Sequence, residues 1–172
     1  MNNGSVAGDF ILTGSLVALA TMTVDDQALF CHWLQDTSLR EQINDHRTPT
    51  MEDQMRWFKR VQEPDRVFFS LVTVTDHTLI GNAGFVDIDE QKKEATLRIT
   101  IGSPEARGKG LGTEAMTLLI QYASVMRRWQ RILLFVSPAN ERAIRTYEKV
   151  GFTRLPDGEQ KDATLLAMVL VL

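Results

Sequence analysis

The stretch from Ala95 to Met116 constrains the fold more than any other part of the chain. Residues 95–101 alternate apolar and polar side chains, which is the period of a half-buried strand, and residues 102–104 (Gly-Ser-Pro) end the run. After a glycine-rich turn, apolar residues recur with the 3.6-residue period of a helix. This apolar face comprises Leu111, Ala115, Leu118, Leu119, Tyr122 and Met126.

The turn reads Arg107-Gly-Lys-Gly-Leu-Gly112 and has the features of an anion site. Its glycines leave backbone amides uncovered where the helix begins, and the N-terminus of a helix attracts negative charge. A Walker A loop is excluded, because it would need glycine in place of Ser103 and serine or threonine in place of Gly110. A dinucleotide-binding loop is excluded by the even glycine spacing and by the lack of further alternating strands and helices.

A second informative stretch covers residues 131–152. Residues 131–136 form a short apolar run that predicts a buried strand. A short helix is predicted to follow, with Asn140 as its N-cap and Gly151 just past its end. Asn140 and Tyr147 are almost two helical turns apart, so they are expected on one side of this helix.

Together the two stretches resemble the GNAT superfamily of acyl-CoA-dependent N-acetyltransferases. Within it, residues 79–89, 95–102 and 112–116 resemble the branch of ribosomal-protein N-terminal, spermidine and amino-sugar acetyltransferases. The resemblance spans nearly the whole chain and implies an α+β (mixed α/β) fold, with one mostly antiparallel sheet flanked by helices. The matching positions are Arg107, Gly110 and Gly112 in the loop, and Asn140, Ala143, Tyr147, Gly151 and Phe152 after it.

The remaining elements follow from the same patterns. The connection at 36–50 is polar and aperiodic; in the superfamily this region is the variable lid that shapes the acceptor pocket, so it is expected to carry substrate choice. The other predicted elements are a strand at 15–20, a helix capped by Thr23 with Asp26 in its first turn and Leu29, Phe30, Trp33 and Leu34 inside, a helix capped by Thr50, a hairpin at 67–88, charged and Pro-Gly turns at 89–94 and 156–158, and a final strand at 163–172.

Length and composition set the frame. The 172 residues predict one domain, with a frayed polar tail at 1–9. A net charge of −3 without a basic run disfavours nucleic acid and anionic membranes as partners. The apolar run 10–20 is too short to span a bilayer and no Lys or Arg precedes it, so a signal peptide is not expected. Cys31 is predicted to be a buried, inert thiol, which fits a reducing cytoplasm.

The resemblance implies acetyl-CoA as co-substrate, without a metal. In the family the central strand splays from its neighbour, which frees main-chain groups for pantetheine and the acetyl oxygen. The pyrophosphate would lie on the loop amides, with Thr113 opening the helix, Asn140 bonding pantetheine, and the Lys109 side chain near a phosphate or in solvent. The implied cofactor-binding residues are Ile99, Thr100, Ile101, Arg107, Gly108, Lys109, Gly110, Leu111, Gly112, Thr113 and Asn140.

Acetyl transfer defines the catalytic requirements. An alkyl amine has a pKa of about 10.4, and only its neutral form attacks a thioester. The enzyme must remove that proton and supply another to the departing thiolate. Tyr147 is the candidate catalytic donor, because a phenol with a pKa of about 10 can donate as charge develops on sulfur. The alternative is a tyrosine that only packs on an amphipathic helix.

The general base is not identified by the resemblance. Relatives often have glutamate at the positions of Thr96 or Phe135, and neither of these side chains can take a proton. Glu94, which is expected in the turn, Asp87 and Glu41 are candidates. A water chain to bulk solvent is an equally good hypothesis, because proximity and orientation supply a large share of such a barrier.

Two function classes stay open. One is an enzyme that moves acetyl to a primary amine, such as a protein N-terminus, a polyamine or an amino-sugar. The other is an acetyl-CoA-binding regulatory module without turnover. Trp33, Trp57 and Trp129 could line a pocket, although the first two lie on amphipathic helices where packing is more common. A homodimer is possible by analogy with relatives.

Overall fold

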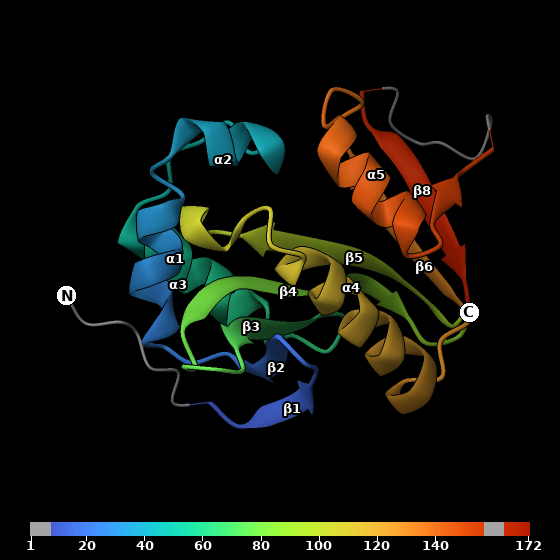
Figure 1. The fold of residues 1–172 in the computed structure, drawn as a ribbon, viewed down its shortest axis with the longest axis horizontal. Helices are drawn as coiled ribbons and strands as arrows, with labels where there is room; N and C mark the ends of the chain where they lie inside the picture. The colour runs from blue at the N-terminus through green and yellow to red at the C-terminus, as the bar shows by residue number, and fades with distance from the viewer. Residues whose placement is uncertain (1–7, 157–163) are drawn as a thin grey trace.

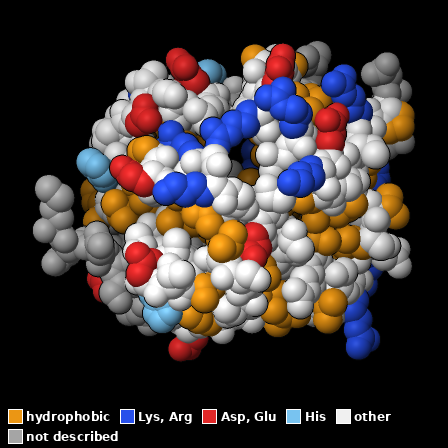
Figure 2. Space-filling view, in the orientation of Figure 1, with side chains coloured by type: hydrophobic (Ala, Val, Ile, Leu, Met, Phe, Trp, Pro, Cys, Tyr) orange, Lys and Arg blue, Asp and Glu red, His pale blue; other side chains and the backbone are white. Residues whose placement is uncertain are grey.

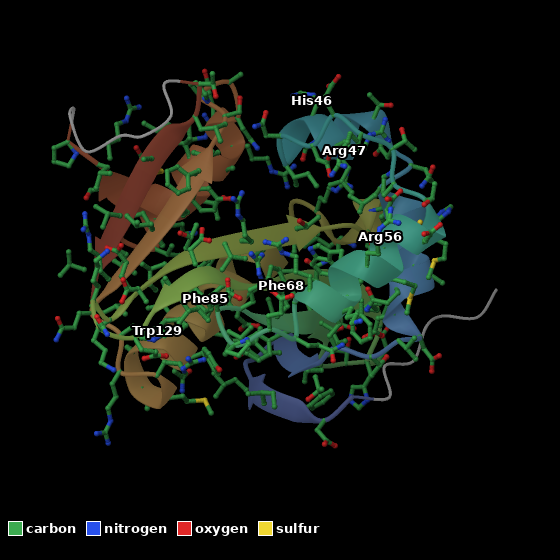
Figure 3. The ribbon with its side chains drawn as sticks, turned by 180° about the vertical axis from the view of Figure 1, so that it is seen from behind. His46, Arg47, Arg56, Phe68, Phe85 and Trp129 are labelled. Carbon is green, nitrogen blue, oxygen red and sulfur yellow. The ribbon has the colours of Figure 1, made fainter. Side chains whose placement is uncertain are left out.

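The computed structural model of the protein describes residues 8–156 and 164–172, which form one sheet flanked by helices (Figure 1). The eight strands lie in the order β1-β2-β3-β4-β5-β6-β8-β7. Helix α4 lies across one face of the sheet, and α3 covers the opposite face, as the front and back views show (Figures 1 and 3). The elements are β1 (Phe10–Thr13), β2 (Val17–Thr21), α1 (Asp26–Trp33), α2 (Thr37–Gln42), α3 (Met51–Arg60), β3 (Val67–Thr73), β4 (Leu79–Asp89), β5 (Glu94–Ile101), the 3-10 turn η1 (Pro104–Ala106), α4 (Leu111–Gln121), the π-helical turn η2 (Tyr122–Met126), β6 (Arg131–Val136), α5 (Glu141–Lys149), β7 (Thr153–Arg154) and β8 (Leu166–Val171).

The sheet is antiparallel except at one junction, which confirms the predicted fold class. Strands β1 to β5 form a meander of antiparallel neighbours, and β6, β8 and β7 form a second antiparallel group. The two groups meet where β5 and β6 run parallel. The helices that follow β5 and β6 therefore return the chain across the same sheet.

Both faces of the central strands are buried, as the sequence of β2 illustrates. Val17 and Leu19 belong to the larger apolar cluster, together with residues of α4. Ala18 and Ala20 point to the other face and pack with Phe30 of α1. Because successive side chains of a strand point to opposite faces, a continuous apolar run fits a sheet that is covered on both sides.

Phe85 of β4 lies in the middle of an aromatic group under the end of α4. Its ring is fully buried, with ring centroids 4.9 Å from Trp129 and 6.2 Å from Tyr122. The predicted apolar face of the helix is confirmed from Leu111 to Tyr122, but Met126 is exposed by 53% and that part of the prediction is wrong. The chain widens there into a π-helical turn, which rotates the side chains that follow out of register with the α-helix.

Two buried side-chain hydrogen bonds fix α1, one to the sheet and one to α3. Ser70 Oγ of β3 donates to Asp26 Oδ2 at 2.7 Å, and Gln54 Nε2 of α3 donates to Gln27 Oε1 at 2.9 Å. All four side chains are buried. Because a buried polar group without a partner costs free energy, these bonds specify how the helices sit on the sheet.

The first strand begins later than predicted, and another strand precedes it. The apolar run from Phe10 folds into the hairpin β1–β2, whose turn contains Gly14 and Ser15, and Gly14 N donates to Val17 O at 2.8 Å. The glycine and serine that interrupt the run are thus a turn. Asp9, predicted as part of a tail, accepts a hydrogen bond from Thr21 N at 2.8 Å. The rest of the predicted tail, residues 1–7, lies outside the described residues.

The lid region contains a helix that the sequence reading missed. Asp36 caps α2 by accepting from Ser38 N at 2.9 Å, and the buried Arg40 donates to Leu34 O at 2.7 Å. Leu39 is the one buried apolar side chain of this six-residue helix, and a single residue sets no hydrophobic period that could indicate it. Helix α1 also starts later than predicted, with Asp25 as N-cap in place of Thr23.

Three other boundaries are settled by the structure. Thr50 caps α3 as predicted, in a reciprocal pair with Asp53. Gly110 is the N-cap of α4, so Thr113 lies within its first turn and does not open it. The short strand β7 was not predicted, and the final strand starts at Leu166. Residue 163 and the positions 157 and 158 of the predicted turn lie outside the described residues.

Glu114 of α4 ties the helix to the β1–β2 hairpin. Its carboxylate accepts backbone hydrogen bonds from Ser15 at 2.9 Å, Leu16 at 2.7 Å and Val17 at 2.6 Å. Hydrogen bonds to an ionised acceptor are the stronger kind. The first turn of α4, next to the glycine-rich loop, is therefore held by hydrogen bonds to the hairpin at the β1 edge of the sheet.

Candidate active site

Strands β5 and β6 separate from each other at the site. Within the described residues, their parallel pairing covers Glu94 to Thr96, opposite Arg131 to Leu133. On its other edge β5 stays paired with β4 as far as Ile101. The β6-facing edge of residues 99–101 is thus left open, as the sequence resemblance implied. Main-chain groups on such an open edge are able to bond an extended ligand.

The glycine-rich loop carries the chain from the end of β5 to α4. Gly108 and Gly110 have φ values of +78° and +80°, a region that L side chains rarely adopt, so glycine is required for this path. The Arg107 guanidinium folds back and donates to the carbonyls of Ile101 at 3.1 Å and Gly102 at 2.9 Å. The Arg107 side chain therefore fixes the loop to the end of β5. The loop leads directly into the N-terminus of α4, where the first backbone amides have no partner within the helix.

Basic side chains surround the entrance to this loop. Figure 2 shows Lys and Arg side chains gathered around a hollow between the regions of α2 and α5. Arg142 of α5 lines the cavity here, and its Nη2 lies 3.6 Å from where a Cβ on Gly108 would be. The combination of a helix N-terminus with a guanidinium suits an anionic ligand such as a phosphate.

A cavity of about 300 Å³ joins these parts. The structure brings ten of the sequence-predicted site residues to its wall: Ile99, Thr100, Ile101, Arg107, Gly108, Gly110, Gly112, Thr113, Asn140 and Tyr147. Two others do not line it. Lys109 is exposed, and the Leu111 side chain is buried in the apolar core beneath α4.

Tyr147 and Asn140 are presented by α5. Asn140 Oδ1 accepts from Ala143 N at 3.2 Å, which confirms the predicted N-cap. Within the described residues the Tyr147 hydroxyl has no hydrogen-bond partner, and the side chain lines two cavities. Burial raises the pKa of Tyr147 above its usual value of 10.0, and the nearby charge of Arg98 opposes that rise. The phenol is therefore protonated at neutral pH and free to donate.

A second cavity of about 660 Å³ lies on the α3 side of the sheet and also reaches Tyr147. Trp57 of α3 and Phe68 of β3 form part of its wall, with ring centroids 5.2 Å apart in an edge-to-face arrangement. Figure 3 shows Phe68 beside α3 and Arg47 near α2 at the other end of this region. Trp33 also lines this cavity, whereas Trp129 is buried in the core.

The base candidates lie in different environments. Glu94 is the first residue of β5, contrary to its predicted place in the turn, and it pairs with Arg131 at 3.1 Å. Glu41 is exposed on α2 and does not line either cavity. Asp87 lines the second cavity, at a bulge in β4 where its φ is +52°. Of these three carboxylates, Asp87 is the one that lines a cavity.

Several cavity residues escaped the sequence reading. On α2 and just after it, Leu39, Gln42 and Ile43 line both cavities. On α5, Arg142 and Thr146 line the first cavity. Helical spacing could have indicated Thr146, because it lies three residues after Ala143, and Ala143 lies three residues after Asn140. The α2 residues carried no such signal, since the helix itself was not predicted.

Residues 8–156 and 164–172 contain no group of three or more His, Cys, Asp or Glu side chains arranged to hold a metal ion. No helix in these ranges has the length and apolarity needed to cross a membrane.

Curated relatives share sequence with the chain. Spermidine N(1)-acetyltransferase of Escherichia coli (strain K12) is 35% identical over 82 residues, which cover 48% of this chain and 44% of that enzyme. The match therefore spans less than half of that relative's length. An N-acetyltransferase 9-like protein of Nematostella vectensis is 23% identical over 93% of this chain and 86% of its own.

Solved structures and a family profile cover more of the molecule. Spermidine N-acetyltransferase from Vibrio cholerae, in complex with CoA and spermine, superimposes with a TM-score of 0.80 at 16% identity, covering 92% of this chain and 96% of that one. At this identity the likeness shows the fold. The acetyltransferase (GNAT) domain profile matches residues 17–153, which include the strand pair, the glycine-rich loop and Tyr147. The chain therefore belongs to the GNAT acetyltransferase family.

Proposed function

We propose that the protein transfers an acetyl group from acetyl-CoA to a primary amine by direct attack in a ternary complex. The observation that carries this proposal is the junction of the two cavities at Tyr147. One cavity runs along the open edge of β5 to the glycine-rich loop, and the other opens on the α3 side. A thioester and an amine entering from opposite ends would meet beside the phenol.

The cofactor would occupy the first cavity. Its pyrophosphate would accept hydrogen bonds from amides of residues 107–112 at the start of α4, with Arg142 adding a positive charge. Pantetheine would bond main-chain groups of residues 99–101, which lack a strand partner on the β6 side. Within the described residues Asn140 uses Oδ1 as a cap, so its Nδ2 is available to donate to the same arm.

The chemical steps would then follow from the side chains at the junction. A backbone amide of β5 would polarise the thioester carbonyl as the neutral amine attacks it. As the tetrahedral intermediate collapses, the C–S bond breaks and the Tyr147 hydroxyl donates its proton to the leaving sulfur. The proton of the incoming ammonium would leave through Asp87 or through water in the second cavity.

Family membership favours the enzyme over the regulatory module that binds acetyl-CoA without turnover. Relatives of the chain are named as N-acetyltransferases, and a structural neighbour was solved with CoA and spermine. These names support a primary amine as acceptor. All the described strands share one sheet, which supports a single functional domain over residues 1–172. A homodimer and a cytoplasmic location are further expectations.

Thiol release from acetyl-CoA in the presence of a panel of amines tests the function. The panel contains peptides, amino acids, polyamines, amino-sugars and aminoglycosides, and each reaction is followed by mass spectrometry of the acetylated product. Release of one thiol per acetylated amine is expected for at least one member. Tight binding of acetyl-CoA without release for every amine would favour the regulatory module.

Substitution of Gly110 tests the cofactor loop. A methyl group at this position meets no atom within 4 Å, but the φ of +80° disfavours alanine by about 1–2 kcal/mol. We expect Gly110→Ala to raise the Kd for CoA roughly 5–30-fold, by isothermal titration calorimetry. Gly151→Ala is the matched control, because it introduces positive-φ strain (φ +104°) at the end of α5, away from the loop. It should lower the Tm and leave the Kd unchanged; equal Kd values for both variants would contradict the assignment.

A further inference from the structure

The second cavity contains charged side chains of both signs. The positive groups are Arg47 from the lid, Arg66 from the segment before β3 and Arg98 from β5, and the negative groups are Asp45, Asp53 and Asp87. The balance of charge that a ligand would meet depends on which of these groups are already paired.

Asp53 and Asp45 already accept hydrogen bonds, and Asp87 lies at the edge of the cavity. Asp53 accepts from Thr50 N at 2.9 Å and from Thr50 Oγ1 at 2.8 Å, and it also pairs with Arg56. These bonds lower the pKa of Asp53 to about 2. Asp45 accepts from Arg47 N at 3.1 Å, and Asp87 is exposed at the bulge of β4. Asp53 is therefore committed to the capping of α3 rather than to a ligand.

Two of the arginines are uncommitted. Within residues 8–156 and 164–172, no carboxylate lies within 4.0 Å of the guanidinium groups of Arg47 and Arg98, and neither group makes a hydrogen bond. Arg66 has a neighbouring acid, with Nε 3.5 Å from Asp65 Oδ1. In the described part of the chain, Arg47 and Arg98 thus carry unpaired positive charge, and Asp45 and Asp87 carry unpaired negative charge; of these four groups, Arg98 is the one whose charge acts on Tyr147.

Arg98 is the arginine of this cavity whose charge acts on the Tyr147 hydroxyl. The alternation of β5 puts it on the same face as Thr96 and Thr100, and it stands opposite Gly84 in β4. Gly84 in turn is opposite Phe68, whose Cγ lies 2.8 Å from where a Cβ on Gly84 would be. The Phe68 ring therefore covers the glycine, on the face of the sheet that carries Arg98. Both Arg98 and Tyr147 line this cavity.

We propose that the acceptor is a primary amine that also carries an anionic group, a carboxylate or a phosphate, which Arg98 binds. The inference rests on the proposed acetyl transfer and names its substrate class. The amine would lie at Tyr147 while the anion is held beside Phe68. A guanidinium donates two parallel hydrogen bonds to a carboxylate or phosphate, so this pairing also orients the amine.

The same charges disfavour a polyamine. A spermidine-like acceptor would bring additional ammonium groups beside the Arg98 guanidinium, which has no acidic partner among the described residues, and like charges repel. The specificity of this chain would then differ from that stated in the names of its spermidine-acetylating relatives. A change of acceptor class within one fold needs only a few side chains at the pocket.

Matched pairs of amines test the proposal. 4-Aminobutyrate and 1,4-diaminobutane have the same four-carbon chain and one differing end, and glucosamine 6-phosphate and glucosamine differ by the phosphate. Tripeptides that begin with Asp or Lys extend the test to larger acceptors. We expect kcat/KM to be about tenfold or more higher for the anionic member of each pair that is turned over, which is the factor that a charge-assisted hydrogen bond supplies.

Variants of Arg98 assign the preference to this residue. Arg98→Met keeps the apolar stem and should reduce the ratio of kcat/KM for the anionic member of a pair to kcat/KM for the other member by about tenfold. Arg98→Glu should reverse the preference. Arg98→Lys should restore part of the ratio, since it keeps the charge without the fork. Arg154→Met, an exposed arginine on β7, is the control and should leave the ratio unchanged. The KM for acetyl-CoA should be unaffected in all four variants.

Each outcome has a distinct reading. A preference for the cationic or neutral member in the wild type, or an Arg98→Met variant with an unchanged ratio, would overturn the proposed acceptor class while acetyl transfer stands. Absence of thiol release with every amine, despite binding of acetyl-CoA, would refute the proposed function and the inference with it. Melting curves of the variants exclude a loss caused by unfolding.

Discussion

Replacing Tyr147 by phenylalanine is expected to lower kcat by roughly 10²–10⁴-fold, which is the usual contribution of a positioned general acid. The reason is that CoA thiolate would have to leave without a proton donor, while the phenylalanine ring still fills the same space. The Kd for acetyl-CoA should stay within about twofold, because pyrophosphate and pantetheine binding use other residues. Stopped-flow or steady-state thiol release, together with calorimetric binding, separates the two quantities.

Tyr122→Phe is the matched control for this variant. Tyr122 is buried under α4, and its hydroxyl accepts a hydrogen bond from Arg127 Nη1 at 3.4 Å, outside both cavities. Its loss should affect the Tm and leave kcat unchanged. A kcat for Tyr147→Phe close to that of the wild type would remove the phenol from the mechanism.

The pH dependence of kcat provides a second readout of Tyr147. Because burial raises the pKa of this phenol, it is protonated at neutral pH, and the rate should fall only as pH rises through the raised pKa. Removal of Arg98 removes a nearby positive charge that lowers this pKa, so the alkaline limb should move further upward in Arg98→Met.

The second large effect is expected at Phe85, in the core. Phe85→Ala removes a fully buried ring that contacts Tyr122 and Trp129, and such truncations cost about 3–5 kcal/mol of unfolding free energy. For a chain of this size the Tm should fall by roughly 6–20 °C, measured by differential scanning calorimetry. Phe85 also pairs with Leu97 of β5, so the loss loosens the strand that leads to the site.

Phe10→Ala is the control for the truncation. Phe10 is 41% exposed on β1, where its ring contacts His77, and its removal should cost less than about 1 kcal/mol. Similar Tm changes for the two variants would show that the aromatic group under α4 is less tightly packed than its burial indicates.

Local patterns in the sequence were sufficient for the centre of the fold. Residues 95–101, 111–121 and 131–136 have strong periodicity or strong boundaries, and a strand, a helix and a strand are found there, although the apolar face of the helix ends at Tyr122 and not at Met126. The glycine-rich loop could be predicted because glycine at Gly108 and Gly110 has a local cause, a positive φ. The position of Tyr147 at the cavities also agrees with its motif.

The features that the sequence could not supply depend on contacts between distant segments. Helix α2 is held by polar bonds and by one buried apolar side chain, Leu39, so it shows no apolar period. The bonds of Glu114 to residues 15–17 join positions almost a hundred apart in the chain. The second cavity combines side chains of the lid, β3 and β5, and the partners of its charged groups are known only once the chain is folded.

The short junction between β5 and β6 has a consequence for how the molecule moves. Three residue pairs join the block of β1 to β5 to the block of β6, β8 and β7, so few main-chain hydrogen bonds hold the two blocks together. Within the sheet of the unliganded protein, hydrogen–deuterium exchange should therefore be faster for those amides of residues 97–101 and 134–136 that point into the gap than for those paired with β4 or β8. A pantetheine arm inserted there would act as a clamp across the gap, and CoA should slow exchange on both of its sides.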